Sequence, residues 1–529
     1  MGHSAPDLVR GRLRFRHRRS GGAGVEAARR TRGGRLRAPR VRLLAGALLL
    51  ALAVYASSFV ISYGDLFRRE DPLLRTDYAR LTSAKVAAVE PAIGVEQLQA
   101  VLADAAARGL TVSIAGSRHS QGGHTYRAGG VVLDMRSFNK VLAVDTVGLL
   151  VTVQSGATWD EVQRAIAPLG LALKVMQSSN IFTVGGTLSA NAHGRDIDVM
   201  QEVQVVQRFH LLLADGRVVE VSRDTNPELF SLVIGGYGLY GVILDVTLRV
   251  TRDELYEQRA VTMDYTAFPA YFAEHIKPDS GVALMLVRPS IDPDPSSFLR
   301  ELVVVTWRRA PAGTQGSFAL TEERHVWRDR FFLGLSRKFD WAKALRWRLQ
   351  TRVELGAGEA RVVSRNNAMR PPLAPLELLQ YRSGKDTDII QEYFVPIERF
   401  VPFMDRFREI LVAGRMNVLS STVRYVAADS TPVLAYAPDK DVFAIIQMSN
   451  VGLSPAGQAH AEAVTRQLVD AAIENGGTYY LTYQLYPTPE QLYRAYPRAG
   501  TAFERKRFYD PQERFSSQFY ERYGHARPE

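Results

Sequence analysis

One segment decides how the first half of this chain is interpreted: Val112-Ser-Ile-Ala-Gly-Ser-Arg-His-Ser-Gln-Gly-Gly-His124. A short strand is expected to end at Ala115, after which the chain turns through small residues. A turn of this kind directs several backbone N–H groups at one point and forms a nest suited to phosphate. The segment therefore predicts an anion-binding loop at the end of a strand.

Two further glycine-rich segments follow in the next part of the chain. One is Asn180-Ile-Phe-Thr-Val-Gly-Gly-Thr-Leu-Ser-Ala-Asn-Ala-His-Gly194, and the other is Gly235-Gly-Tyr-Gly-Leu-Tyr-Gly-Val242. Small residues at these positions let a flat ligand approach the backbone closely. A single loop of this kind more often marks only a tight turn, so the prediction of a ligand depends on the three loops together.

The common nucleotide-binding fingerprints do not accompany these loops. No lysine of the Walker type follows the first loop, and no strand, helix and acidic residue stand in the register of a Rossmann fingerprint. The sequence therefore supports neither an ordinary nucleotide hydrolase nor an enzyme that uses NAD.

Residues 85–250 alternate predicted strands and helices. An amphipathic helix is predicted over 95–107, and Thr158-Trp-Asp-Glu161 is a capping box for a helix that runs to about Leu169. Ala214-Asp-Gly216 predicts a hairpin turn. The strands predicted here are 111–114, 131–134, 149–153, 204–213, 217–221 and 242–250.

The region from 251 to about 450 is less regular. It contains strand-like runs at 282–286, 302–305 and 443–446, and a helix is predicted at 458–473. A stretch rich in Trp and Arg, residues 325–352, is expected to form a helix packed on the domain. An amphipathic helix lying on a membrane surface is the alternative.

Charge is distributed unevenly along the chain. The formal net charge is +11, and residues 1–42, with thirteen Arg and only Asp7 and Glu26 as acids, account for all of it. The remaining body is neutral, which argues against a nucleic-acid partner. The absence of cysteine excludes disulfides, thiolate nucleophiles and metal sites of the cysteine type, and we expect no metal site.

An apolar run follows the Arg-rich segment directly. Residues 43–61 carry no charge, and at ~1.5 Å rise per residue they nearly span a hydrocarbon core of ~30 Å. The sequence predicts a single transmembrane helix over 43–62. The preceding arginines predict a cytoplasmic tail over 1–42 and a catalytic body on the non-cytoplasmic side. A buried core helix and a cleaved signal peptide are the alternatives, although the run is long for the latter.

The order of the three loops resembles the FAD-binding domain of the vanillyl-alcohol-oxidase family, also called the PCMH-type domain. The resemblance covers residues 80–250 and includes Val153-Gln-Ser-Gly-Ala-Thr158 and the Ala214-Asp-Gly216 hairpin. It implies an α+β fold in which two subdomains hold FAD. It also implies an α+β substrate-binding cap over 251–480 and a segment over 481–529 that returns to the FAD domain.

The resemblance assigns cofactor contacts residue by residue. It implies that the backbone of the first loop binds the pyrophosphate, and that the second and third loops contact the flavin or the adenine. The residues concerned are Ala115, Gly116, Ser117, Arg118, His119 and Ser120; Thr183, Gly185, Gly186, His193 and Gly194; and Gly238, Gly241, Val242 and Ile243.

Gly116-Ser-Arg-His-Ser120 is similar to the corresponding turn of the alditol and aldonolactone oxidases. In related oxidases a histidine four positions after the strand carries the flavin covalently, and His119 stands at that spacing. His124 is the alternative attachment point, and a non-covalent flavin is the third possibility. A doubly linked cysteinyl form is excluded because the chain has no cysteine.

Later segments extend the likeness to the same oxidases. Gln391-Glu-Tyr-Phe-Val-Pro396, which precedes a predicted helix, and Thr422-Val-Arg-Tyr-Val-Ala-Ala-Asp429 resemble parts of their cap, and residues 503–515 resemble their closing segment. One departure is clear. Those oxidases carry a lysine before the closing segment, and that lysine serves the reaction. Gln484 stands at the comparable place here, which makes it a catalytic candidate and puts a lactone or sugar-alcohol substrate in doubt.

The resemblance implies hydride transfer to flavin from a CH–OH substrate, with oxygen or a membrane quinone as electron acceptor. Arg424 is the candidate to stabilise negative charge on the flavin or to bind the substrate, and Glu392, Tyr483 and Tyr480 are candidate proton acceptors. The alternatives are a flavin-dependent reductase of a lipid or sterol C=C bond, as in the sterol side-chain reductases, and a flavin-free scaffold with the same fold.

Overall fold

The computed structural model describes residues 38–64, 71–177, 179–199, 201–322, 326–356, 360–370 and 381–526. The chain divides into two units, Met1–Ser58 and Phe59–Glu529. The second unit contains the folded body. Of the Arg-rich tail predicted over residues 1–42, only residues 38–42 belong to the described part.

The apolar run near the amino terminus forms a helix, α1 (Ala38–Gly64). The prediction of a helix is therefore confirmed over these residues. Among the helices that the structure describes, however, none is both long enough and apolar enough to cross a membrane. The predicted transmembrane role of residues 43–62 is accordingly not supported.

A small parallel sheet begins the body. Its strands β3 (Ala88–Pro91), β5 (Val131–Asp134) and β4 (Val112–Ala115) lie in the order β3-β5-β4, and helix α2 (Val95–Ala107) connects β3 with β4. A hairpin of β1 (Leu74–Thr76) and β2 (Ser83–Lys85) precedes it. Leu98, Leu102 and Ala105 on α2 are buried, so the predicted amphipathic helix is confirmed.

A six-stranded antiparallel sheet follows. Its order is β10-β9-β11-β7-β6, with β8 joined to β11. The strands are β6 (Val141–Asp145), β7 (Leu150–Gln154), β8 (Leu171–Leu173), β9 (Val206–Leu212), β10 (Val218–Ser222) and β11 (Val242–Arg252), and the helices are α3 (Trp159–Ile166), α4 (Val184–Ser189) and α5 (Pro227–Val233). The predicted capping box is present, since the Thr158 side chain accepts from the Glu161 N–H and Glu161 returns a bond to the Thr158 N–H.

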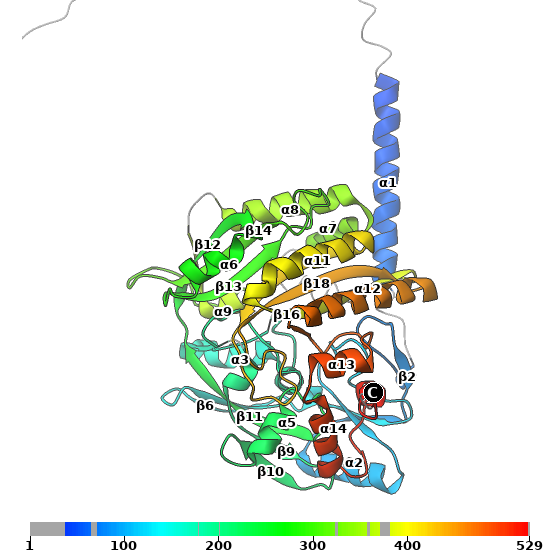
Figure 1. The fold of residues 1–529 in the computed structure, drawn as a ribbon, viewed down its shortest axis with the longest axis vertical. Coiled ribbons are helices and arrows are strands. Elements are labelled where there is room, and N and C mark those ends of the chain that lie inside the picture. Colours follow the sequence, from blue (N-terminus) through cyan, green and yellow to red (C-terminus); the bar gives the residue numbers. More distant parts are fainter. Residues whose placement is uncertain are drawn as a thin grey trace, which may run out of the picture. The chain divides into compact units, whose positions relative to one another are not determined.

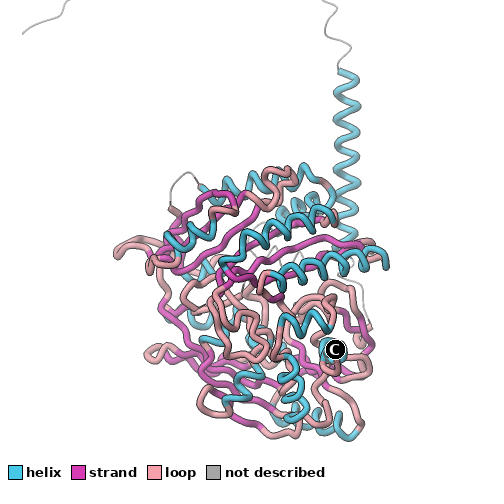
Figure 2. The backbone as a smooth tube through the Cα atoms, in the orientation of Figure 1, coloured by secondary structure: helices cyan, strands magenta, loops and turns pink. Residues whose placement is uncertain are grey.

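The third layer is an eight-stranded sheet, here called the cap sheet, in the order β15-β12-β14-β13-β17-β18-β16-β19. In Figure 2 its strands and those of the six-stranded sheet form two separate groups. The cap strands are β12 (Leu255–Asp264), β13 (Val282–Pro289), β14 (Glu301–Arg309), β15 (Arg361–Ser364), β16 (Asp386–Pro396), β17 (Asn417–Val426), β18 (Val442–Gly452) and β19 (Thr478–Tyr479).

Helices cover both faces of the cap sheet. Helices α11 (Phe400–Ala413) and α12 (Pro455–Glu474) run along one face (Figure 1), where the Gln391 amide donates to Thr465 Oγ1 at 2.6 Å. Helices α7 (Val326–Lys338) and α8 (Asp340–Leu355) contact the other face. The stretch rich in Trp and Arg therefore packs on the domain, as the sequence predicts. Two short helices, α6 (Phe268–Tyr271) and α9 (Arg365–Met369), complete this region.

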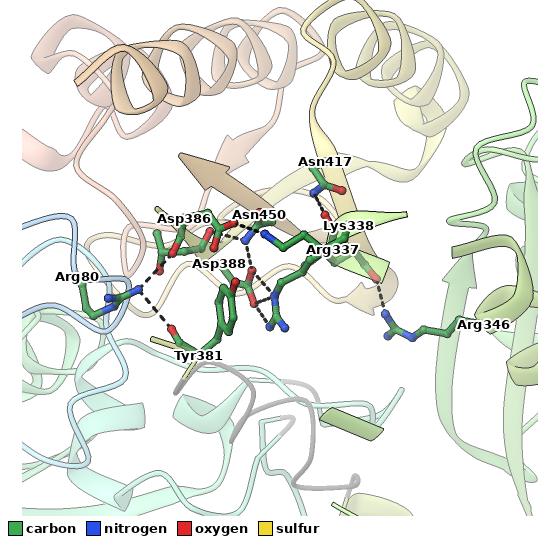
Figure 3. Close-up of polar contacts among 11 residues, drawn as sticks. Arg80, Arg337, Lys338, Arg346, Tyr381, Asp386, Asp388, Asn417 and Asn450 are labelled. Atoms are coloured by element: carbon green, nitrogen blue, oxygen red, sulfur yellow. Dashed lines mark hydrogen bonds and ion pairs between the residues drawn. The ribbon is translucent and has the colours of Figure 1, made fainter. Parts of the chain in front are cut away.

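Figure 3 shows how α7 attaches to β16. The buried guanidinium of Arg337 forms an ion pair with Asp388, and the Asn450 amide donates to the same carboxylate at 2.9 Å. Lys338 Nζ donates to Asp386 at 2.9 Å. Because side chains alternate along a strand, Asp386 and Asp388 share their face with Glu392, whereas Gln391 faces α12. The face that binds α7 is thus the face that carries Glu392.

The carboxyl-terminal segment returns to the first sheet. After α13 (Pro489–Ala495) and α14 (Ala499–Tyr509), and before α15 (Gln518–Tyr523), the chain lies parallel to β4. Val112 N donates to Arg514 O at 2.7 Å, and Ser516 N donates to Val112 O at 2.9 Å. The Arg514 guanidinium also donates to the carbonyls of Leu110 and Ala105, at 2.7 and 3.2 Å. The last residues therefore extend the edge of the first sheet.

We expect Arg514→Gln to destabilise the body by about 2 kcal/mol, because it leaves two buried carbonyl oxygens without a charged donor. The measurement is the thermal unfolding midpoint, followed by intrinsic fluorescence. Arg494→Gln is the control, since Arg494 is exposed and makes only a 3.4 Å ion pair with Asp470. Equal midpoints for the two variants would contradict a structural role for Arg514.

Candidate cofactor and active site

The first glycine-rich segment forms a compact loop, here called the first loop, at the end of β4. Gly116 has no room for a side chain, because a Cβ atom there would collide with the Thr183 hydroxyl. Arg118 has a left-handed backbone conformation with φ 59°, and Gly122 and Gly123 follow with φ 115° and 77°. Ser117 Oγ donates to Ile181 O at 2.8 Å, which joins the first loop to the second glycine-rich segment. The sequence-predicted turn is confirmed.

The second glycine-rich segment packs closely against the end of β7. Thr183 is the N-cap residue of α4, and Gly185 N donates to Ser155 O at 2.8 Å. A Cβ on Gly185 would lie 2.7 Å from Ser155 Cβ, and one on Gly194 would lie 2.7 Å from Met176 O. Both glycines are therefore required for packing of the segment. Gly186 has less crowded surroundings, with Thr183 Oγ1 at 2.8 Å from its ideal Cβ position.

The third segment leads into the six-stranded sheet. Gly238 has φ 75° and lies beside Ile114 of β4, which brings this turn next to the first loop. Gly241 has φ 154°, and its ideal Cβ position is 2.6 Å from Leu212 O. Val242 and Ile243 pair with Leu212 and Leu211 in the sheet and are buried in the core. The structure therefore gives Gly241, Val242 and Ile243 a packing role in addition to the predicted cofactor contact.

Buried polar atoms without protein partners gather on these loops. Within the described residues, Nδ1 of His119 and Oγ of Ser120 on the first loop make no hydrogen bond. Several neighbouring atoms on the second segment and on the end of β7 share this property. They belong to Ser155, Gln177, Ser179, Asn180 and His193. Because buried polar groups are normally hydrogen-bonded, such a concentration fits a polar ligand held between these loops.

Two histidines of the first loop have different surroundings. The His119 ring lies between Tyr78 and Phe182, with centroids 4.7 and 4.4 Å away. Burial, together with the charge of Arg118, lowers the pKa of His119 to about 3, so the imidazole is neutral. His124 instead lies deep among Phe519 and Tyr237, and its Nε2 is 2.7 Å from Leu481 O. His124 therefore attaches the first loop to the carboxyl-terminal segment.

A carboxylate on the cap meets the second segment. His193 Nε2 and Glu392 Oε1 lie 2.5 Å apart, and both side chains are only 2% exposed. Tyr483 donates to the other Glu392 oxygen at 3.4 Å, and burial raises the pKa of the Tyr483 phenol well above its usual value. The structure thus brings together Glu392, Tyr483 and His193, which the sequence places in three different segments.

Arg424 belongs to the same site. It lies on β17, and its Nη1 donates to His193 O at 3.2 Å, while its buried Nε makes no hydrogen bond to any described residue. Burial lowers the pKa of Arg424, and the charge of Glu392 opposes that effect. Tyr480, in contrast, donates its hydroxyl to Ala190 O at 3.0 Å, so its proton is already engaged by the backbone.

Gln484 has different partners from the other predicted catalytic residues. Its Nε2 donates to Asp77 Oδ2 at 2.6 Å. Asp77 also accepts from Gly122 N at 3.2 Å and from the backbone N–H groups of Leu81 and Thr82. Burial raises the pKa of Asp77, although all of these hydrogen bonds act in the opposite direction. Gln484 therefore helps to fix the first loop.

Asp77 and Gln121 are site residues that the sequence does not reveal. Asp77 lies in a stretch that looks like a polar spacer, and no motif marks it. Gln121 joins the first loop to the cap, since its Oε1 accepts from Ile390 N at 3.2 Å and its N–H donates to Thr482 O at 3.0 Å. Glycine spacing predicts where the first loop turns, but it carries no information on which distant residues fix it.

Comparison with known proteins agrees with this geometry. Residues 87–222 match the family model described as FAD binding domain. Decaprenylphosphoryl-beta-D-ribose oxidase of Mycolicibacterium smegmatis is 31% identical over 159 residues, covering 30% of this chain and 35% of that protein. Cytokinin dehydrogenase 1 of Oryza sativa subsp. japonica is 30% identical over 241 residues, 44% of each chain. L-gulonolactone oxidase of Bos taurus is 32% identical over 155 residues, 29% of this chain and 35% of that protein.

The protein therefore carries an FAD-binding domain of the PCMH type, the class that the resemblance of the loops implied. FAD is its cofactor. The residues present fit this group, because the first loop has no room for a side chain at Gly116 and the surrounding loops present buried polar atoms without protein partners. The chain spans only between 35% and 44% of the length of the three relatives.

We expect Gly116→Val to weaken FAD retention by about tenfold or more, because overpacking at a filled position costs on the order of 1–3 kcal/mol. The ratio of flavin to protein absorbance after purification, and after reconstitution with excess FAD, measures the effect. Gly384→Val is the matched control, since an added Cβ there meets nothing within 4 Å. Undiminished flavin in Gly116→Val would contradict the assignment of the first loop.

Proposed function

We propose that the protein is an FAD-dependent oxidoreductase that removes a hydride from a CH–OH group. The observation that carries this proposal is the buried contact between His193 of the FAD domain and Glu392 of the cap. It gives the site an acid–base group beside the segments that hold the cofactor. The names of the relatives support the reaction class, since two are oxidases and one is a dehydrogenase.

The cofactor, when bound, supplies hydride acceptance, and the protein supplies position and charge. Glu392 accepts the proton of the substrate hydroxyl, which helps the C–H bond to release its hydride. His193 and Tyr483 hold the two carboxylate oxygens in place. The Arg424 guanidinium lies in the same site and stabilises the negative charge that develops. Oxygen or a quinone then takes the electrons.

We expect Glu392→Gln to lower the rate of flavin reduction by roughly 10²–10⁴-fold with FAD content unchanged, because the amide cannot accept a proton. The measurement is anaerobic bleaching of the flavin by a panel of alcohols, hydroxy acids and lactones. Glu398→Gln is the control, since Glu398 is exposed and pairs with Lys440 at 2.7 Å. If the unaltered protein is bleached by no CH–OH donor, the proposed reaction class is wrong.

We also propose that His119 carries the flavin covalently. Its imidazole is neutral, and its Nδ1 meets no hydrogen-bond partner in the described chain, so a nucleophilic nitrogen is available. His124 is a weaker candidate because its Nε2 already contacts Leu481 O at 2.7 Å. Burial lowers the pKa of His124 as well, to about 4, so the contact with Leu481 O, and not the charge of the ring, favours attachment at His119.

The covalent bond can be tested by acid precipitation of the purified protein. We expect the flavin to remain with the pellet, and to pass into the supernatant in His119→Ala. His460→Ala, at an exposed histidine on α12, should retain it. Full release of flavin from the unaltered protein would refute covalent attachment while leaving the FAD-binding domain intact.

A further inference from the structure

Three arginines lie close enough to influence one another near the site, and they are here called the arginine cluster: Arg195, Arg288 and Arg424. Arg195 donates through Nη1 to Ala368 O at 3.1 Å, and Arg424 donates through Nη1 to His193 O at 3.2 Å. Arg288 pairs with Glu354 at 3.0 Å, whereas no acidic side chain of the described residues lies within ion-pair distance of Arg195 or Arg424.

The fold brings the arginine cluster to one face of the cap sheet. Val423 of β17 pairs with Val287 of β13, so Arg424 and Arg288 share the opposite face by alternation. Arg195 follows the His193 and Gly194 pair, and its carbonyl accepts from Met285 N of β13 at 2.9 Å. The cluster therefore lies where the segment after Gly194, in the FAD domain, contacts strands β13 and β17 of the cap.

Carboxylates near Arg195 and Arg424 are already engaged by other groups. Glu354 pairs with Arg288 at 3.0 Å, Asp388 pairs with Arg337, and Glu392 holds His193 and Tyr483. Arg195 lies over the Trp307 ring at 5.9 Å, which fixes the guanidinium without neutralising it. Among the described residues, these carboxylates are thus engaged, whereas Arg195 and Arg424 form no ion pair.

Mutual repulsion among the arginines has a measurable electrostatic effect. Burial, and then the charges of Arg424 and Arg288, lower the pKa of Arg195 to about 9. Burial also lowers the pKa of Arg424, and the charge of Arg288 acts in the same direction. Arg195 remains protonated at neutral pH, and an anion would relieve both the desolvation and the repulsion.

The cluster is accessible from solvent, because Arg195 is only partly buried. Arg424 is 6% exposed, and its Nε and that of Arg195 have no partner in the described chain. Guanidinium groups bind carboxylate and phosphate oxygens through paired N–H donors. The unused donors therefore match an oxygen anion rather than a neutral sugar or hydrocarbon.

We propose that Arg195 and Arg424 bind an acidic oxygen group of the substrate, a carboxylate or a phosphate, and so orient its CH–OH carbon toward Glu392. The inference rests on the proposed function and narrows it to alcohols that carry an acidic group. A hydroxy acid and a phosphate-bearing alcohol present the same anionic oxygens, and the experiment below separates them.

The first measurement uses the full-length, FAD-loaded protein without any substrate. Sodium phosphate or sodium acetate is titrated at constant ionic strength, and the unfolding midpoint and the flavin difference spectrum are recorded. We expect a saturable change with at least one anion, and an affinity about tenfold or more weaker in Arg195→Gln. Arg195→Lys is a second variant in case Arg195→Gln loses its fold, and Arg348→Gln, exposed on α8, is the matched control.

The second measurement compares glycerol, glycerate and glycerol 3-phosphate as flavin reductants. Preference for glycerate assigns the carboxylate class, and preference for glycerol 3-phosphate assigns the phosphate class. Equal anion affinity in all variants, or no anion binding at all, overturns the inference even if glycerol bleaches the flavin. Arginine-dependent anion binding without bleaching by any alcohol supports the anion site and overturns the proposed oxidation instead.

Discussion

The carboxylate of Asp77 receives four hydrogen bonds, and the geometry of the cofactor site depends on it. Its donors are the Gln484 amide and the backbone N–H groups of Gly122, Leu81 and Thr82. Three separated parts of the chain therefore meet on one side chain that is 4% exposed. Because a buried carboxylate is stable only with donors such as these, the first loop, the amino-terminal hairpin and the segment after β19 are held together as one unit.

The proposed active site depends on a second constraint, the alternation of side chains in the cap sheet. Glu392 and Asp388 share a face of β16, so the strand that presents the proposed acid–base group also binds α7 through Arg337. Arg424 of β17 lies on that same face and reaches the carbonyl of His193. A shift of one residue in the register would turn these charged side chains toward α11 and α12, where the core is apolar. The register of the cap strands thus determines both which charged side chains face the site and how helix α7 packs on the sheet.

The sequence predicts the local structure of the first domain well, because glycine spacing, the Thr158 capping box and the period of α2 are local signals. It also predicts that Glu392, Tyr483 and Arg424 belong to the site, through resemblance. It cannot predict the contact of His193 with Glu392, since these residues are far apart in the chain and no periodicity links them. Gln484 fixes a loop, which its position alone does not indicate. The apolar run at residues 43–61 correctly predicts the helix α1, but the structure does not support the predicted membrane span.

The strand-like segment beside β4 has a consequence for synthesis of the protein. Residues 514–516 complete the edge of a sheet whose other strands lie between Ala88 and Asp134, so this sheet is finished about 380 residues after its last other strand has been made. Until residues 514–516 are made, β4 presents an open edge and the carbonyls of Ala105 and Leu110 lack the Arg514 guanidinium. A nascent chain therefore has an exposed pairing edge throughout translation, the condition under which chaperones are most needed.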